Sequence, residues 1–236
     1  MSTSSIQIPM EDLITRQINF WEKSRKRPFV KASLFKNLTI SQSIGSNGAE
    51  LGRAIARRLG WQFFDKEIVN YIANNTHVRK NIVELFDEKT RSEMDTLIAT
   101  ILDKNAINKE IYFKQLTKAM ITVGQHGNAV IIGRGGNLIL PDKMALKVCV
   151  IRNFADRVKE YSHTTGDPEK AEKELKKSDI MRSLFIRKNF HKEANNPDNF
   201  DIVLNLSKID LITAENIIIG ALTVKYGVSE EELKIK

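Results

Sequence analysis

The chain of 236 residues has a single cysteine and no long apolar run. One thiol excludes a disulfide within the chain, and Cys149 lies in an apolar run, where a lone thiol is typical of the core. Such cysteine usage is typical of a reducing compartment, so we expect a cytoplasmic protein. No apolar run approaches the roughly 18 residues that span a membrane. The polar N-terminus, with Glu11 and Asp12, also lacks the pattern of a signal peptide.

Aromatic residues are scarce, at 7% of the chain, and they do not interleave with lysine and arginine as they do in nucleic-acid stacking platforms. Nucleic-acid binding is therefore a minor hypothesis. The net charge of +8 favours an anionic partner, and nucleotides, nucleic acid or a membrane surface would each fit. A solvated basic surface fits as well. Metal-ligand spacing is also missing, because His163 and His191 are isolated from other ligand types.

The length favours one large α/β domain, at residues 37–236, preceded by an extension at residues 1–36. Five apolar residues of the extension fall near one face of a predicted helix: Met10, Leu13, Ile14, Ile18 and Trp21. The segment ends in a basic cluster followed by proline: Lys23, Arg25, Lys26, Arg27 and Pro28. We expect the apolar face to cover its own domain or a second subunit of a homo-oligomer. The basic end suggests a membrane-surface role as the alternative.

Residues 38–60, LTISQSIGSNGAELGRAIARRLG, predict a strand, a glycine-rich turn and an amphipathic helix. The turn consists of Gly45, Ser46, Asn47 and Gly48. A glycine-rich turn at a helix N-terminus presents unpaired backbone N–H groups and the positive end of the helix dipole. The stretch is therefore a candidate phosphate-binding loop.

The usual phosphate loop, G-x-x-x-x-G-K-[ST], also supplies a lysine for the β- and γ-phosphates and a hydroxyl for Mg²⁺. When the two patterns are registered on their helix ends, its first glycine falls on Gln42, its lysine on Gly48 and its hydroxyl on Ala49, beside Glu50. Neither the lysine nor the hydroxyl is present. An ordinary strand-to-helix turn therefore stays an alternative to a phosphate site.

Four further apolar runs predict strands. They lie at residues 61–65, 129–132, 145–151 and 201–206, with helices expected within 66–126, at 154–161 and at 214–226. The second strand ends in Asp65, and Gly133 and Arg134 follow the third. Ligands gather at the carboxyl ends of parallel strands, so Arg134 is placed to bind phosphate. An arginine at a solvated turn would look the same.

The segment at residues 162–199 is highly charged and holds two prolines and two histidines. Such a segment suits a mobile flap between a helix and the last strand. Within it, Asp179 and Arg182 lie one helical turn apart, so both side chains would point the same way.

Five strands alternating with helices predict a doubly wound parallel sheet with helices on both faces, because crossovers are right-handed. Over residues 38–226 the chain resembles the cytidylate kinase-like family of P-loop nucleoside monophosphate kinases. The matching pieces, in chain order, are ISQSIGSNGAELGRAIARRLG, FFDKEIVNYIA, AVIIGRGG followed by LPD, the helix with Ala155-Asp156-Arg157, Asp179-x-x-Arg182 and FDIVLNLSKI.

This resemblance implies a P-loop NTPase-type three-layer α/β/α fold with a five-stranded parallel sheet in the order 2-3-1-4-5. It also implies a helical monophosphate-binding insertion at residues 66–126 and a lid at residues 162–199. The implied reaction is transfer of the γ-phosphoryl group of ATP, with Mg²⁺, to CMP or a similar monophosphate.

The resemblance also implies roles for individual residues. Arg134 matches the arginine that grips the acceptor phosphate. Asp179 and Arg182 match a lid pair, with Asp179 on the acceptor and Arg182 on the transferring phosphate. Asp65 matches an acceptor-side carboxylate after the second strand, and Arg157 is a further lid-side residue.

Several positions depart from the family pattern. The usual aspartate after the third strand is Gly135 here, which weakens the expectation of pyrimidine specificity. Losing the loop lysine removes a charge that offsets the transferring oxygens, and one such donor can be worth about a hundredfold to a thousandfold in rate. Arg53 or Arg57 could partly replace it from the helix. Glu50 could bind the metal directly or repel the nucleotide.

Two functions follow from these matches and departures. The retained Arg134, Asp179 and Arg182 favour an ATP-dependent kinase acting on a nucleotide or a related small molecule. The degenerate phosphate loop favours a non-catalytic protein that binds nucleotides and regulates or interacts with others. We prefer the kinase, because a fully inert scaffold has no need of acceptor-side and lid residues.

Overall fold

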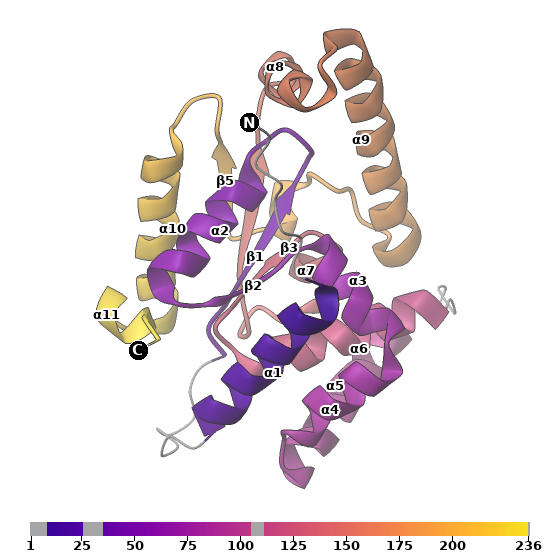
Figure 1. Ribbon diagram of the computed structural model, residues 1–236, viewed down its shortest axis with the longest axis vertical. Coiled ribbons are helices and arrows are strands. Elements are labelled where there is room, and N and C mark those ends of the chain that lie inside the picture. Colours follow the sequence, from indigo (N-terminus) through magenta and orange to yellow (C-terminus); the bar gives the residue numbers. More distant parts are fainter. Residues whose placement is uncertain (1–8, 26–34, 105–110, 236) are drawn as a thin grey trace.

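The computed structural model describes residues 9–25, 35–104 and 111–235. Its centre is a five-stranded parallel sheet in the order β2-β3-β1-β4-β5, which confirms the predicted order (Figure 1). The strands are β1 (Asn37–Gln42), β2 (Gln62–Phe64), β3 (Ala129–Ile132), β4 (Leu146–Ile151) and β5 (Ile202–Asn205). Strand β1 pairs with β3 on one side and β4 on the other, so its carboxyl end lies between theirs.

Helices cover both faces of this sheet, as the three-layer fold requires. One face carries α2 (Gly48–Leu59), α10 (Leu211–Tyr226) and α11 (Glu230–Leu233). The other face carries α1 (Met10–Arg25), α3 (Lys66–Asn74), α4 (Thr76–Glu84), α5 (Glu88–Lys104), α6 (Ile111–His126), α7 (Gly136–Ile139) and α9 (Pro168–Phe190). Figure 1 shows α2 and α10 on the opposite side of the sheet from α3 and α6. Each face has its own apolar core.

Strand β1 shows how the sequence selects these faces. Leu38 and Ile40 are buried in the core under α2 and α10, whereas the alternating residues Asn37 and Thr39 point to the opposite face. A strand buried on both sides alternates in direction without becoming exposed. Cys149 on β4 is buried as predicted, and burial raises the pKa of its thiol.

Asn37 is a fully buried polar residue whose amide is satisfied. Its Nδ2 donates to the carbonyl oxygens of Gly124 (2.9 Å) and Met144 (2.8 Å), and its Oδ1 accepts from the Ala129 N–H (3.2 Å). Its backbone also exchanges two hydrogen bonds with the hydroxyl of Tyr226, the last residue of α10. Because an unpaired buried amide is costly, this network fixes the start of β1 against α6, β3 and α10.

The N-terminal helix α1 packs on its own chain. Ile14 is buried, and Met10 and Ile18 pack partly buried against the core that α3 and α4 share. This agrees with the expectation that the apolar face covers its own domain. The side chains of Leu13 and Trp21 and the basic cluster lie outside the described part of the structure. The domain division and the homo-oligomer stay predictions.

Helices α3 to α6 form the segment between β2 and β3 where an insertion was expected. Helix α8 (Phe154–Thr165) and helix α9 make up most of the expected flap and lie beside each other at the end of the sheet where the β1–α2 loop lies (Figure 1). Asp167 caps α9 by accepting from two backbone N–H groups, and Pro168 occupies its first turn. The flap segment is thus largely one 23-residue helix, and its motion stays a prediction.

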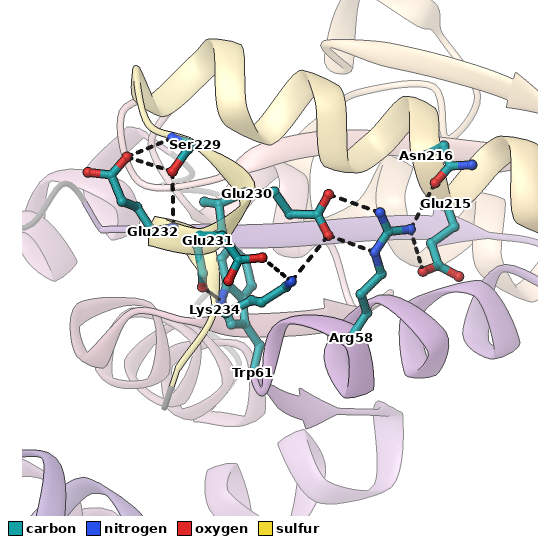
Figure 2. Close-up of polar contacts among 10 residues, drawn as sticks. Arg58, Trp61, Glu215, Asn216, Ser229, Glu230, Glu231, Glu232 and Lys234 are labelled. Carbon is teal, nitrogen blue, oxygen red and sulfur yellow. Dashed lines mark hydrogen bonds and ion pairs between the residues drawn. The ribbon is translucent and has the colours of Figure 1, made fainter.

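The C-terminal segment is fastened to α2 by polar contacts (Figure 2). The Arg58 guanidinium lies between Glu230, which it contacts with two nitrogens at 2.9 and 3.0 Å, and the Glu215–Asn216 pair of α10. The Trp61 indole donates to the Leu233 carbonyl at 2.7 Å. Within the described ranges, no helix combines the length and apolar character needed to cross a bilayer.

Candidate functional site

The predicted phosphate loop lies between β1 and α2, at the carboxyl edge of the central strand. Gly45 has φ +78°, and Asn47, which precedes α2, has φ +60° and provides no side-chain cap. A Cβ at Gly45 would lie 2.9 Å from the Arg157 carbonyl oxygen. Glycine is required there both by the left-handed backbone and by the contact with α8.

The side chain of Gln42 closes this loop from the inside. Its Oε1 accepts a hydrogen bond from the Ala49 N–H in the first turn of α2 (3.0 Å) and one from the Ser46 hydroxyl (3.3 Å). The Ser46 hydroxyl also lies 2.7 Å from the Ser43 carbonyl oxygen, and Ser46 is fully buried. Gln42 therefore does the capping that Asn47 does not.

Other backbone donors of the loop stay available. Among the described residues, no hydrogen-bond acceptor lies opposite the N–H groups of Gly45, Asn47 or Gly48. These groups stand at the positive end of the α2 dipole, where an anion is favoured. The loop can thus still contact a phosphate through its backbone.

Arg157 of α8 holds the loop to α9. Its Nε donates to the Ile44 carbonyl oxygen (2.7 Å), and its Nη1 and Nη2 form a bidentate pair with both Asp179 oxygens (2.8 and 2.9 Å). The Arg157 side chain is 7% exposed and the Asp179 side chain 34%. Arg152 also reaches the loop, at the Gly45 carbonyl oxygen, and pairs with Glu160. Asp179, one member of the lid pair that the family resemblance implies, is thus engaged with the further lid-side residue Arg157 and not with Arg182.

Arg182 of α9 has neutral partners. Its guanidinium donates to the Ser41 hydroxyl at the end of β1 (2.8 Å), to the Asn195 side-chain oxygen (2.7 Å) and to the Ala194 carbonyl (3.2 Å). Burial lowers the pKa of Arg182, but an arginine side chain in a protein stays protonated. A positive charge without a carboxylate in direct contact therefore lies at the carboxyl edge of the central strand.

Arg134, directly after β3, borders a cavity of about 420 Å³ between α3, α6 and α9. The lining residues are Asn70, Asn74, Tyr112, Arg134, Met181, Leu184, Phe185, Lys188 and Asn189. The Arg134 guanidinium lies 5.8 Å from the Phe185 ring centre, and no hydrogen bond or ion pair joins it to a described residue. Burial raises the pKa of Tyr112, and the charge of Arg134 offsets part of that rise.

Asp65 and Arg53 lie close to each other at the start of α3. Asp65 Oδ1 caps α3 by accepting from the N–H groups of Glu67 and Ile68 at 3.0 Å, and its Oδ2 lies 3.9 Å from Arg53. The Arg53 guanidinium also lies over the Phe63 ring at 4.9 Å. In this arrangement the Arg53 side chain reaches β2 and α3, so replacing the loop lysine would require it to swing away.

The donor set fits a nucleotide-bound metal better than a metal held by protein alone. Within the described ranges, no group of three histidines, cysteines or carboxylates is arranged to hold a metal ion. Glu50 is exposed in the first turn of α2. Mg²⁺ is commonly held by one or two carboxylates together with substrate phosphates. Glu50 would then be a single protein ligand to a metal brought by ATP.

A model of the cytidylate kinase-like family matches residues 37–208 of this sequence. The chain belongs to this family. That match confirms the resemblance on which the family-based site predictions rest, while the individual roles of those residues stay predictions. No curated protein matches the chain.

Three solved structures align with this chain, and the first of them is similar in fold. A protein from Eubacterium ventriosum ATCC 27560, described as uncharacterized, has a TM-score of 0.61 and 21% identity, covering 80% of this chain and 99% of its own. Shikimate kinase from Acinetobacter baumannii, in complex with shikimate, has a TM-score of 0.45 and 12% identity, covering 81% and 95%. Shikimate kinase from Bacteroides thetaiotaomicron has a TM-score of 0.42 and 12% identity, covering 79% and 97%. At these identities the likeness concerns the fold alone.

Sequence reasoning missed two parts of the site. The register of the loop had identified Gln42 as a departure, but not that its side chain would cap α2. The amide of Asn74 and the phenol of Tyr112, which donates to Asn70 at 2.7 Å, belong to no motif, and Asn70 lies in the matching piece FFDKEIVNYIA without a role assigned to it. Only their spacing on two helices that face the carboxyl edge could have indicated them.

Proposed function

We propose that this protein transfers the γ-phosphoryl group of ATP to a nucleoside monophosphate, CMP-like, or to a related small phosphate-bearing acceptor. The observation that carries the proposal is Arg134, whose guanidinium borders the cavity without an anionic partner among the described residues. Its Nε is buried and unpaired, and a buried donor of this kind costs about 1–3 kcal/mol. An acceptor phosphate would supply the missing acceptor atoms and charge.

The cavity walls suit a molecule of modest size with one anionic end. Asn70 and Asn74 offer side-chain amides that can both donate and accept, while Met181, Leu184 and Phe185 provide an apolar wall. With Arg134 at the β3 end, an acceptor would place its phosphate toward the carboxyl edge of the sheet. This is the edge where the β1–α2 loop begins.

In the proposed reaction an acceptor oxygen forms a bond to the γ-phosphorus, and the bond from that phosphorus to the ADP oxygen breaks. Bound ATP with Mg²⁺ would supply the phosphoryl group and neutralise part of its charge. The free N–H groups of Gly45, Asn47 and Gly48 would position the donor phosphates, and Arg182 would offset charge on the transferring oxygens. Without a loop lysine, we expect slow turnover.

The alternative is a non-catalytic nucleotide-binding protein, which a specific observation favours. Gln42 occupies the inside of the loop, and Arg157 and Asp179 satisfy each other. These contacts would hold the donor side in an arrangement that needs no substrate. ATP binding without turnover would match this alternative.

An ATP-turnover assay across nucleoside monophosphates and small phosphorylated acceptors, with Mg²⁺ or Mn²⁺, tests the proposal. We expect ADP formation that depends on an added acceptor and falls in Arg134→Ala and Arg182→Ala. Arg187→Ala is the matched control, because Arg187 lies on α9 and its side chain is 63% exposed. Binding of ATP with no turnover under any metal or acceptor would favour the alternative, and no ATP binding would remove both.

A further inference from the structure

Gln42 and Gly48 are in close contact across the phosphate loop. A Cβ built on Gly48 would lie 2.7 Å from Gln42 Oε1 and 3.0 Å from Gln42 Cβ. The first distance is shorter than real Cβ contacts allow, and the second is tight even if the carboxamide turns away. A side chain at position 48, lysine included, therefore requires the Gln42 carboxamide to turn away and its Cβ to shift by a few tenths of an ångström, and a smaller residue at position 42 would remove both demands.

The Gln42 carboxamide also accepts hydrogen bonds from donors that would otherwise be available to a phosphate. Gln42 Oε1 accepts from the Ala49 N–H and from the Ser46 hydroxyl, both at the N-terminus of α2. The backbone donor fixes which end of the amide faces the helix, because an amide nitrogen cannot accept that bond. The loop is thus partly filled by the chain itself.

We propose that Gln42 sets how strongly this loop binds phosphate, and that the glutamine at position 42 and the glycine at position 48 form one coupled departure from the lysine-bearing loop. Gln42 acts as a positioning residue: it holds the first turn of α2 and keeps the inside of the loop closed. The inference deepens the donor side of the proposed function, on which it rests.

The coupling makes opposite predictions for stability and for anion binding. Gln42→Gly removes the cap and lowers the melting temperature, but it frees the Ala49 N–H, and we expect about tenfold tighter binding of inorganic tripolyphosphate. Gln42→Glu keeps an acceptor at the helix N-terminus and preserves the melting temperature. Its negative charge should weaken tripolyphosphate binding by about tenfold.

A lysine at position 48 tests whether the Gln42 side chain excludes a side chain at that position. We expect Gly48→Lys to lower the melting temperature more in the natural chain than in the Gln42→Gly background, where the space is free. The Gln42→Gly/Gly48→Lys protein should bind tripolyphosphate more tightly than Gln42→Gly alone. Calorimetric titration with tripolyphosphate and thermal unfolding of the full chain measure both effects.

The proposal is overturned if binding and stability fall together in Gln42→Gly, since that is the behaviour of a purely structural residue. It is also overturned if Gly48→Lys lowers the melting temperature equally in the natural chain and in the Gln42→Gly background. Tripolyphosphate binding needs no acceptor and no turnover, so these outcomes are distinct from a failure of the proposed kinase activity.

Discussion

Replacing Arg157 with alanine tests whether this residue is a structural link or a catalytic ligand. The substitution removes three hydrogen bonds at once: one to the Ile44 carbonyl of the phosphate loop and two to Asp179 of α9. All three partners stay in place. The Ile44 carbonyl and the Asp179 carboxylate would then be left without the guanidinium that satisfies them.

The expected loss of unfolding free energy in Arg157→Ala follows from the burial of the Arg157–Asp179 pair. Removing one partner of a fully buried ion pair costs about 3–5 kcal/mol, because the other charge is left uncompensated. The Arg157 side chain is 7% exposed, but the Asp179 side chain is 34% exposed, so water can reach the carboxylate and reduce the penalty. We expect a loss of about 2–3 kcal/mol in the free energy of unfolding, which lowers the melting temperature of a chain this size by about 5–10 °C.

The matched control is Arg187→Ala, which also removes an arginine from an ion pair. The pair of Arg187 with Glu193 is solvent-exposed on both sides, so its loss should cost less than about 1 kcal/mol. Urea denaturation of the two variants, together with Asp179→Ala and the Arg157→Ala/Asp179→Ala double variant, gives the coupling energy directly. The structural reading fails if Arg157→Ala is no less stable than Arg187→Ala. Lost turnover at full stability would instead support the lid role that the family resemblance implies.

Three further predictions concern the frame around the site. Gly135→Ala should destabilise more than Gly133→Ala in denaturant unfolding: both glycines have φ +71°, but a Cβ at Gly135 would lie 2.6 Å from Phe190, whereas Gly133 faces open space. Equal losses would contradict the overlap with Phe190. Burial raises the pKa of Tyr226 to about 12, so the folded state holds its phenol proton more tightly than the unfolded chain, where tyrosine titrates near 10. The raised pKa contributes roughly 2–3 kcal/mol to the free energy of unfolding. This contribution is complete below pH 10 and is lost between pH 10 and about 12. Unfolding curves of the natural chain and of Tyr226→Phe, recorded at stepped pH, should therefore converge over that interval. Asn37→Ala should cost about 2–5 kcal/mol, because it leaves the buried Met144 carbonyl and the Ala129 N–H unpaired and removes one of the two hydrogen bonds to the Gly124 carbonyl, and a denaturation midpoint like that of the natural chain would refute this.

The positions of β3 and β4 were predictable because each is a continuous apolar run with a turn signal after it, whereas the order of the strands was implied by the family resemblance. The run at residues 129–132 followed by Gly133 is an example, and its pairing with β1 and β2 is the one expected for this fold. The end of α9 and the short α7 were not predicted. Their residues pack against neighbours distant in sequence, such as Phe190 against Gly135, and local periodicity does not contain that information.

The site was predicted in its residues more than in its contacts. Arg157 and Asp179 were both named, but their pairing joins two helices across 22 residues and depends on the α8–α9 turn. Asp65 was assigned an acceptor role because of its place after β2. Its position at a helix start is also the usual signal for a cap, and the structure has it capping α3.

The arginines at the carboxyl edge of the sheet divide into two groups by their partners. Arg53, Arg152 and Arg157 each have a carboxylate within 4 Å, so their charges are largely offset within the protein. Arg134 has no anionic partner among the described residues, and the direct partners of Arg182 are neutral oxygens. A positive charge kept from water without a counter-charge is costly, and an anionic ligand relieves that cost when it binds. Among the described residues, the arginines without a carboxylate in direct contact thus lie after β3 and on α9, while the donor loop is closed by a neutral glutamine. We therefore propose that this charge arrangement favours the binding of an acceptor phosphate over that of the nucleotide donor.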